Sequence, residues 1–113
     1  MHEMALAEEV RRIVEEVALA QSSRRVASVV LEIGELAAVE VDALRFCLDL
    51  ALHGGAAEGA SLEFVSEPGE GICPHCGARG PLHARLDPCA RCAGYGVRPV
   101  AGTAMRVKAV EVA

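Results

Sequence analysis

Two Cys-x-x-Cys pairs constrain this chain more than any other feature of its sequence. Cys73 and Cys76 form the first pair, Cys89 and Cys92 form the second, and twelve residues separate Cys76 from Cys89. Each pair directs two sulfurs at one point, and two pairs brought together make a tetrahedral S4 cage that suits Zn²⁺. Because such a site has no open coordination position, we expect the zinc to be structural, so that any activity must come from other residues.

Two other interpretations of the cysteines compete with zinc. Two disulfides would require an oxidising compartment, and no cleaved leader is recognisable at the start of the chain. A thioredoxin-like redox pair would sit at a helix start after a strand. Here each pair lies among turn residues, namely Pro74 and Gly77 in one case and Pro88 and Gly94 in the other. The sequence therefore favours zinc.

The composition limits the partners. The chain has 113 residues, 52% of them hydrophobic but only 3% aromatic, and a formal net charge of -5. An acidic chain is poorly suited to bind nucleic acid, which is bound through basic patches on phosphate. Net negative charge fits a protein that handles cations or docks on a basic surface. No apolar run reaches the length of a membrane span, so we expect a cytoplasmic protein with no membrane partner.

Hydrophobic spacing predicts two helices and three strands. Apolar residues recur at helical spacing between about Met4 and Ala20 and again from Val41 to a stop at His53 and Gly54. β-branched or alternating segments predict the strands. The predicted strands are Val26–Gly34, Ser61–Glu67 and Ala104–Val112, with a slip in alternation near Ala109 that indicates a bulge or an exposed edge.

This order predicts an α+β fold in which two helices pack on one face of a small three-stranded sheet. Pro68–Gly71 is predicted to be a linker into a zinc knuckle inserted between the last two strands. We therefore expect residues 1–67 plus 104–113 to form an α/β domain and residues 68–103 to form an inserted zinc-binding domain. An exposed last strand would also permit exchange of strands between copies of the chain in a homo-oligomer.

His2 is the most informative residue outside the cysteine stretch. An imidazole one residue from a free α-amino group can join that amine and deprotonated backbone amides in a planar N4 site, which favours Ni²⁺ or Cu²⁺ over Zn²⁺. The competing interpretation is a solvated histidine with no role. Glu3 has two compatible roles, as a first-turn carboxylate that suits the helix dipole or as an acceptor that orients the imidazole.

Other reactive side chains have structural explanations. Cys47 lies on the apolar stripe of the second helix and is expected to be a small buried hydrophobe. Glu40 and Asp42 are expected to start or cap that helix, and His53 to interact with its negative end. Three arginines give the zinc stretch a basic character, which fits either a docking surface or solvation around an anionic zinc–thiolate cage. These are Arg79, Arg85 and Arg91.

Four segments of the chain together resemble the HypA/HybF family of hydrogenase maturation nickel metallochaperones. They are Met1-His2-Glu3-Met4, the run from Leu31 to Leu36, the segment from Ala43 to Cys47, and the cysteine stretch ending at Tyr95. The resemblance covers essentially the whole chain in order. It implies a nickel-binding domain and a zinc-binding domain in one chain.

The resemblance also implies ligands and partners. Nickel would be held by the Met1 amine, His2 and adjacent backbone amides, with Glu3 nearby, and zinc by the four cysteines. The partners would be a GTPase nickel-insertion accessory protein and the large subunit of nickel-iron hydrogenase, with urease a further client of some members. His75 and His83 match no flanking histidine of the family, so neither receives a role.

No nucleophile–base set or phosphate-binding loop stands out, so we expect a carrier and not an enzyme. The alternative function is a zinc-ribbon protein-interaction module that transports no metal.

Overall fold

The computed structural model describes residues 2–113, so the predicted Met1 amine ligand lies outside the described residues. The chain divides into two compact units. The helical unit comprises Met1–Leu31, Val39–Phe64 and Arg106–Ala113, and the cysteine unit comprises Glu32–Ala38 and Val65–Met105. The elements in order are α1 His2–Ala20, β1 Val26–Gly34, α2 Val41–Leu52, β2 Ser61–Glu67, β3 Glu70–Ile72, β4 Arg79–Pro81, β5 Arg98–Ala101 and β6 Met105–Val112.

Helix α1 begins at His2, two residues before the predicted start near Met4. Its buried face combines two valines with two alanines and one glutamate. The buried residues are Glu3, Ala7, Val10, Val14 and Ala18. Small residues such as alanine allow neighbouring elements to approach closely, so the buried face is set by packing as well as by hydrophobicity. No helix within residues 2–113 is both long and apolar enough to cross a membrane.

Helix α2 is capped at both ends by its own sequence. The Glu40 side chain accepts a hydrogen bond from the Asp42 N–H at 2.8 Å, as an N-cap residue does. At the other end His53 is the C-cap, and Gly54 follows with φ +77°. Glycine suits that left-handed position because it has no Cβ. The predicted boundaries of this helix are therefore confirmed, with the His53 ring turned to Glu58 at 2.9 Å.

The two helices lie side by side with the same direction. Near their starts the Glu3 carboxylate accepts the Glu40 N–H at 3.2 Å. Two turns further on, the Arg11 guanidinium donates to the carbonyl oxygens of Ala51 and His53, at 2.6 and 3.2 Å. The first half of α1 therefore runs along α2 in roughly the same direction, and the first turn of α1 lies against the N-cap of α2.

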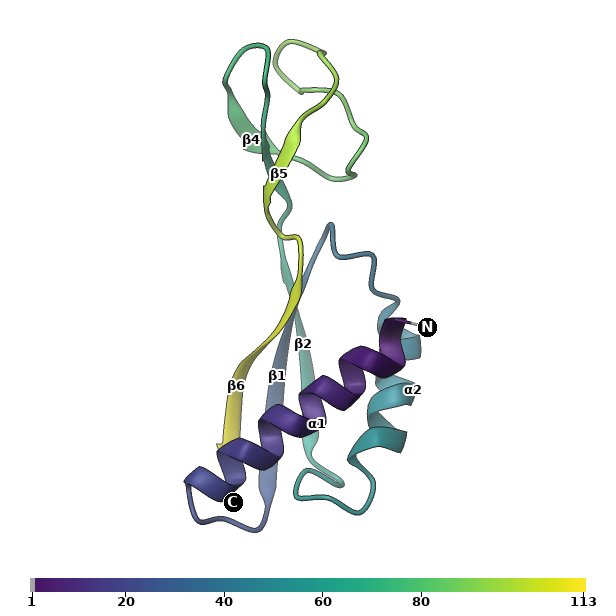
Figure 1. Ribbon diagram of the computed structural model, residues 1–113, viewed down its shortest axis with the longest axis vertical. Helices are drawn as coiled ribbons and strands as arrows, with labels where there is room; N and C mark the ends of the chain where they lie inside the picture. The colour runs from purple at the N-terminus through teal and green to yellow at the C-terminus, as the bar shows by residue number, and fades with distance from the viewer. Residues whose placement is uncertain (1) are drawn as a thin grey trace. The chain divides into compact units, whose positions relative to one another are not determined.

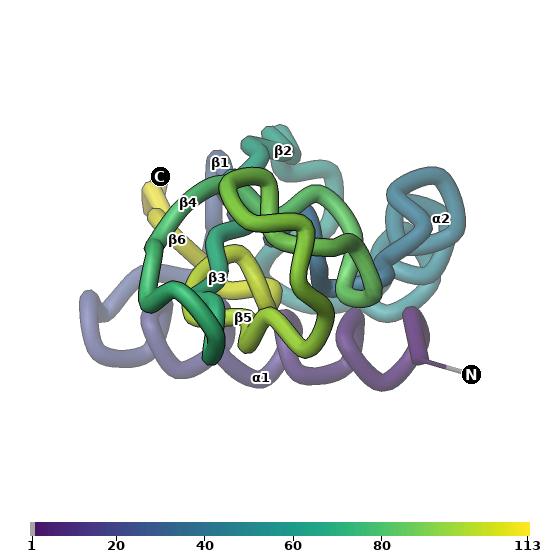
Figure 2. Tube along the Cα trace, turned by 90° about the horizontal axis from the view of Figure 1, so that it is seen from above, coloured from purple at the N-terminus to yellow at the C-terminus, as the bar shows by residue number. Residues whose placement is uncertain are grey.

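The predicted three-stranded sheet is confirmed, in the order β2-β1-β6. Strands β1 and β2 have the predicted bounds, and β6 is an edge strand whose burial alternation slips at Lys108 and Ala109. Helix α1 crosses one face of this sheet (Figure 1), and the view from above shows it lying to one side of the strands with α2 beside it (Figure 2). The α+β architecture with two helices and an inserted four-cysteine module is thus the predicted fold.

The core of the helical unit is aliphatic. Residues from both helices and from β1 are removed from water, and each large aliphatic side chain so buried contributes about 1.5–3 kcal/mol. The most buried of these are Val10, Val14, Val26, Val29, Leu31, Leu44 and Leu48. The chain builds this core without tryptophan and with only two phenylalanines and one tyrosine.

The cysteine unit contains a second small sheet that the sequence analysis missed. Its order is β4-β3-β5, and β3 pairs antiparallel with both neighbours. The predicted linker Pro68–Gly71 is therefore partly wrong, because Glu70 and Gly71 belong to β3. Strands of three residues are too short to show an alternating pattern, and these are also rich in glycine and proline.

Three glycines allow close crossing of backbone segments at the base of this sheet. A Cβ on Gly34 would overlap the backbone of Gly102, and a Cβ on Gly69 would overlap the carbonyl oxygen of Leu82. Gly102 itself has φ +72°, and its Cβ would lie 2.6 Å from the carbonyl oxygen of Pro68. Only glycine fits at these three positions, which we call the glycine crossing.

Candidate metal sites

The first Cys-x-x-Cys pair forms a tight knuckle after β3. The Gly77 N–H donates to the Cys73 carbonyl at 2.9 Å, and Gly77 has φ +72°. Inside the turn the His75 N–H points at the Cys73 sulfur, 3.4 Å away. Backbone N–H groups aimed at sulfur stabilise a thiolate, so this local geometry prepares Cys73 for metal binding.

The second pair repeats the arrangement with a different residue at the left-handed position. The Ala93 N–H donates to the Cys89 carbonyl at 2.8 Å, and Ala93 takes φ +62° where the first knuckle has a glycine. The N–H groups of Arg91 and Gly94 point at the sulfurs of Cys89 and Cys92, each at 3.4 Å. The knuckle is therefore maintained although its turn residue is less suited to positive φ.

The four sulfurs converge. The ligand atoms of Cys73, Cys76, Cys89 and Cys92 all lie within 4.8 Å of one another. The Sγ atoms of Cys73 and Cys92 are 3.6 Å apart, and those of Cys76 and Cys89 are 3.8 Å apart. A tetrahedral zinc with Zn–S bonds of about 2.3 Å needs sulfurs about 3.8 Å apart, so the cage has the size that zinc requires. Disulfide bonding would need a separation of about 2.05 Å, and all four are free thiols.

The thiols differ in acidity because their neighbours differ. The N–H groups of Cys92 and Arg91 lower the pKa of Cys89 to about 6. The N–H of Cys76, with that of His75, lowers the pKa of Cys73. At Cys92 the N–H of Gly94 lowers the pKa, but the neighbouring sulfurs and burial outweigh it and raise the value to about 11. Closely spaced thiolates repel one another, and a divalent cation at their centre would relieve that repulsion.

His75 connects the two knuckles through contacts that the sequence did not indicate. Its Nε2 lies 3.0 Å from the Tyr95 carbonyl oxygen. Gly94 lies so close beneath the ring that a Cβ there would be 2.7 Å from the imidazole. The ring therefore stands beside the sulfur cage and links the knuckles from outside it. Neither His75 nor His83 belongs to the sulfur cluster in the part of the chain described.

His83 makes a different contact that sequence spacing could not reveal. Its Nδ1 lies 2.8 Å from the carboxylate of Glu35, whose other oxygen accepts the Gly69 N–H at 2.9 Å. These two contacts lower the pKa of Glu35, the Gly69 bond having the larger effect. Nearby, the Arg85 Nε donates to the Leu36 carbonyl at 3.2 Å. Glu35 therefore joins three segments of the cysteine unit.

Two of the three arginines of the cysteine stretch have partners in the structure. Arg79 pairs with Glu70 at 2.8 Å, across the β3–β4 pair, and Arg85 bonds Leu36. Arg91 lines a hollow of about 290 Å³ beside the cage. Two of the three positive charges in this stretch therefore bind groups within the cysteine unit.

The second candidate site is the start of α1. The His2 side chain is 57% exposed, and its Nδ1 lies 3.9 Å from the Glu3 carboxylate. Glu3 is only 9% exposed. The Glu40 N–H, then the N–H of Glu3 itself and the charge of His2, hold the pKa of Glu3 below its ordinary value. Because the first four N–H groups of a helix have no intrahelical partner, the backbone amides beside His2 are not committed to the helix ladder. Both roles considered for Glu3 are compatible with this geometry.

Known proteins match the whole chain. A family model described as "Hydrogenase/urease nickel incorporation, metallochaperone, hypA" matches residues 1–112. A protein of Azoarcus sp. (strain BH72), "Hydrogenase maturation factor HypA", is 55% identical over 108 residues, which is 96% of this chain and 95% of that protein. A protein of the same name from Dechloromonas aromatica (strain RCB) is 45% identical over 112 residues, 99% of each chain.

Solved structures agree with the fold. The solution structure of "the Ni metallochaperone HypA from Helicobacter pylori" superposes with a TM-score of 0.75 at 24% identity, covering 99% of this chain and 97% of that one. At that level of identity the likeness supports the fold alone.

Proposed function

We propose that this chain, which belongs to the family of hydrogenase and urease nickel-incorporation metallochaperones known as HypA, binds Ni²⁺ at its own N-terminus and delivers it for maturation of nickel-iron hydrogenase. The observation that carries the proposal is the exposed His2 ring at the first residue of α1, beside the buried carboxylate of Glu3. The ligands would be the Met1 amine, the His2 imidazole and the amides of His2 and Glu3. Planar nitrogen donors favour Ni²⁺ over Zn²⁺.

The position of His2 suits a carrier. An exposed ligand set can pass an ion to an acceptor by stepwise exchange, whereas a site locked by surrounding hydrogen bonds releases metal slowly. Glu3 supports the site from one side while it is held by the N–H of Glu40. Since nitrogen ligands must lose protons to bind metal, nickel affinity should fall as pH falls.

In this proposal the four cysteines hold a structural zinc that stays with the protein. Zinc would neutralise the crowded sulfurs, and the backbone N–H groups that point at Cys73, Cys89 and Cys92 would stabilise them as thiolates. The functional division into residues 1–67 plus 104–113 for nickel and 68–103 for zinc remains a prediction. So do the remaining assignments: a carrier that is not an enzyme, a cytoplasmic location, a GTPase partner, the hydrogenase large subunit as client, and service to urease.

The experiment is a Ni²⁺ titration by calorimetry on zinc-loaded protein with its native N-terminus. Wild type should bind about one nickel per chain, and His2→Ala should lose it while keeping its zinc. The matched control is His53→Ala, because His53 is an exposed histidine of the same unit, at the end of α2 remote from His2 in the parallel helix pair. A variant with two residues added before Met1 should behave like His2→Ala.

Equal binding by wild type and His2→Ala would contradict the N-terminal site. If none of the proteins bound nickel, the zinc-ribbon interaction module would be the better description.

A further inference from the structure

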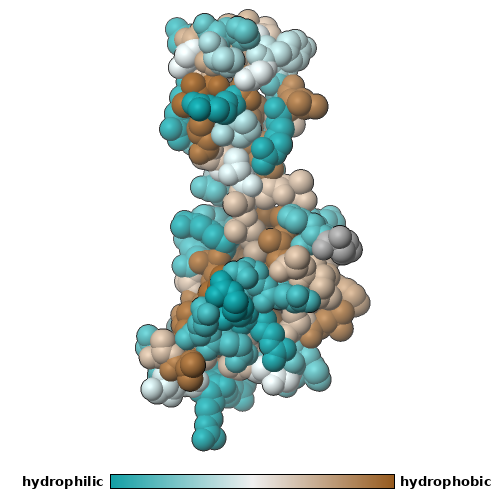
Figure 3. All heavy atoms as spheres, viewed as in Figure 1, coloured by the Kyte–Doolittle hydropathy of each residue, from teal (hydrophilic) through white to brown (hydrophobic). Residues whose placement is uncertain are grey.

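The outward face of α2 is apolar although it faces solvent. Phe46 is 65% exposed and Leu50 is 54% exposed, one helical turn apart on the same side of the helix. The opposite side supplies Leu44 and Leu48, which are completely buried. Figure 3 shows the resulting hydrophobic surface over α2 on the right of the helical unit. Apolar residues that lie next to one another on an exposed surface are typical of interaction sites.

This surface continues onto the first turns of α1. Leu50 lines a hollow of about 340 Å³ together with Met4, Glu8 and Arg11 of α1. Phe46 lies one turn nearer to the start of α2 than Leu50 does, and the start of α2 contacts the first turn of α1 through Glu40 and Glu3. The start of α1 carries His2. The apolar surface formed by Met4, Phe46 and Leu50, which we call the α2 face, therefore borders the proposed nickel ligands.

The rim of the α2 face is acidic. Glu8 flanks it on α1, and Asp42 and Asp49 flank it on α2, all three exposed. Within residues 2–113 none of these three carboxylates forms an ion pair. Unpaired acids around an apolar centre complement a partner that has basic residues around an apolar centre.

The two nearby arginines contact groups other than these three carboxylates. The Arg11 guanidinium is held by carbonyl oxygens at the end of α2. The Arg45 guanidinium stacks over the Phe64 ring, 4.6 Å from its centroid. Neither guanidinium is therefore paired with Glu8, Asp42 or Asp49, although Arg11 also lines the hollow beside Leu50.

We infer that the α2 face docks the protein that exchanges nickel with His2, and that this partner presents an apolar side chain ringed by lysine and arginine. The inference rests on the proposed function, because ligand exchange requires the acceptor to contact His2 and so to cover the surface beside it. Phe46 is the anchor: an aromatic side chain at the centre of an interface commonly contributes most of its affinity. The acids around it accelerate association and select the basic partner.

The test measures binding of the zinc- and nickel-loaded chain to the purified GTPase nickel-insertion protein of the same organism. Phe46→Ala should weaken binding roughly 30-fold, the loss typical of a hot-spot residue. Leu50→Ala should weaken it less. Leu19→Ala is the matched control, because Leu19 is 81% exposed on the last turn of α1, at the other end from His2. All three variants should keep one nickel and one zinc, so a failure of docking is distinguishable from a failure of the nickel site.

Charge reversal tests the rim separately. Asp49→Lys should lower the association rate several-fold at low salt, and the difference should shrink as salt rises. Glu63→Lys, an exposed charge reversal on β2, should have little effect. Unchanged affinity in Phe46→Ala would overturn the inference. It would also be overturned if the chain alone formed a dimer that Phe46→Ala abolished, because the face would then serve a second copy of the chain.

Discussion

The two units of this chain are stabilised internally in different ways. Among the described residues the helical unit buries twelve hydrophobic side chains, drawn from α1, α2, β1 and the turn after α2. The cysteine unit buries four, one of which is Cys73, a member of the sulfur cage. A small segment with so little apolar burial cannot offset its conformational entropy by hydrophobic packing alone, so we expect it to depend on a metal bound by the four cysteines. The helical unit has no such need.

The largest expected effect therefore comes from breaking the sulfur cage. Cys73→Ala, or removal of zinc by a strong chelator, should unfold the cysteine unit, because zinc binding to such sites is worth about 10–16 kcal/mol and is coupled to folding. Limited proteolysis should then cut between residues 70 and 100, while the helical far-UV circular dichroism signal largely persists. Cys47→Ala is the control, because Cys47 is buried in α2 outside the cage. If the helical signal were lost together with the zinc, the helical unit would also depend on the metal, and the two units would not differ in this respect.

The next effect comes from breaking the aliphatic core. Leu44→Ala leaves a cavity at a position with no exposure to solvent and should cost about 2–5 kcal/mol in the free energy of unfolding. Chemical denaturation followed by circular dichroism measures it. Leu50→Ala on the exposed face of the same helix should change stability by less than about 0.5 kcal/mol. Zinc stoichiometry should stay at one in both variants, since the metal site belongs to the other unit.

A smaller effect is expected at Glu35 in the cysteine unit. Its folded-state pKa lies below the ordinary value of 4.5, so its carboxylate stabilises the fold above that pH and the contribution is lost as pH falls through the lowered value. The Gly69 amide resonance should follow this titration by NMR, with a midpoint below 4.5. At pH 7, Glu35→Gln should speed hydrogen exchange at the Gly69 amide several-fold, whereas Glu63→Gln should not. Identical exchange in both variants would refute a role for the carboxylate.

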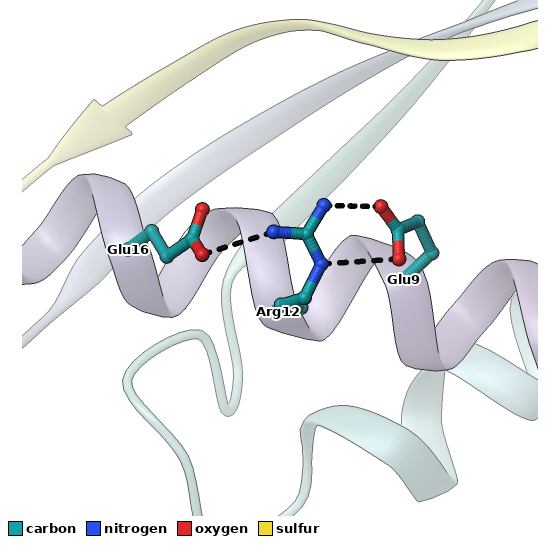
Figure 4. Close-up of polar contacts among 3 residues, drawn as sticks. All are labelled: Glu9, Arg12 and Glu16. Atoms are coloured by element: carbon teal, nitrogen blue, oxygen red, sulfur yellow. Dashed lines mark hydrogen bonds and ion pairs between the residues drawn. The ribbon is translucent and has the colours of Figure 1, made fainter.

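The smallest effect is expected for the most conspicuous ion pairs in the molecule. On the outer side of α1, Arg12 donates to Glu9 through two nitrogens and to Glu16 at 2.9 Å (Figure 4). These contacts lower the pKa of Glu9 and raise that of Arg12. All three side chains are more than half exposed, so solvent and salt screen their attraction. Arg12→Gln should leave the denaturation midpoint unchanged within error at 150 mM salt. A clearly lower denaturation midpoint would mean that surface ion pairs contribute substantially to the stability of the helical unit, in addition to its aliphatic core.

Sequence reasoning succeeded where local chemistry decides the outcome. The bounds of β1 and β2 followed from β-branched alternation, the end of α2 from His53 and Gly54, and the convergence of four cysteines from their spacing. It was less successful where a partner distant in the chain decides. The bonds of Glu35 to Gly69 and His83 join residues 34 and 48 positions apart, and no periodicity carries that information.

Two intermediate cases have physical explanations. The buried face of α1 includes Ala7 and Ala18 as well as Val10 and Val14, and alanine carries too weak a hydrophobic signal to mark that face in the sequence. Strands β3, β4 and β5 escaped prediction because each has only three or four residues. The first knuckle lies in the loop that joins β3 to β4, which pair antiparallel.

The glycine crossing has a consequence for mutational tolerance. Gly34, Gly69 and Gly102 are far apart in the sequence, and none of them can ligate a metal through a side chain. No side chain would be tolerated at these positions, because a Cβ at each would meet backbone atoms that cannot move aside. A saturation scan of the chain should therefore find three intolerant positions that ligate nothing. Anyone mapping function from such a scan would be led to a cluster of essential residues whose only contribution is to have no side chain.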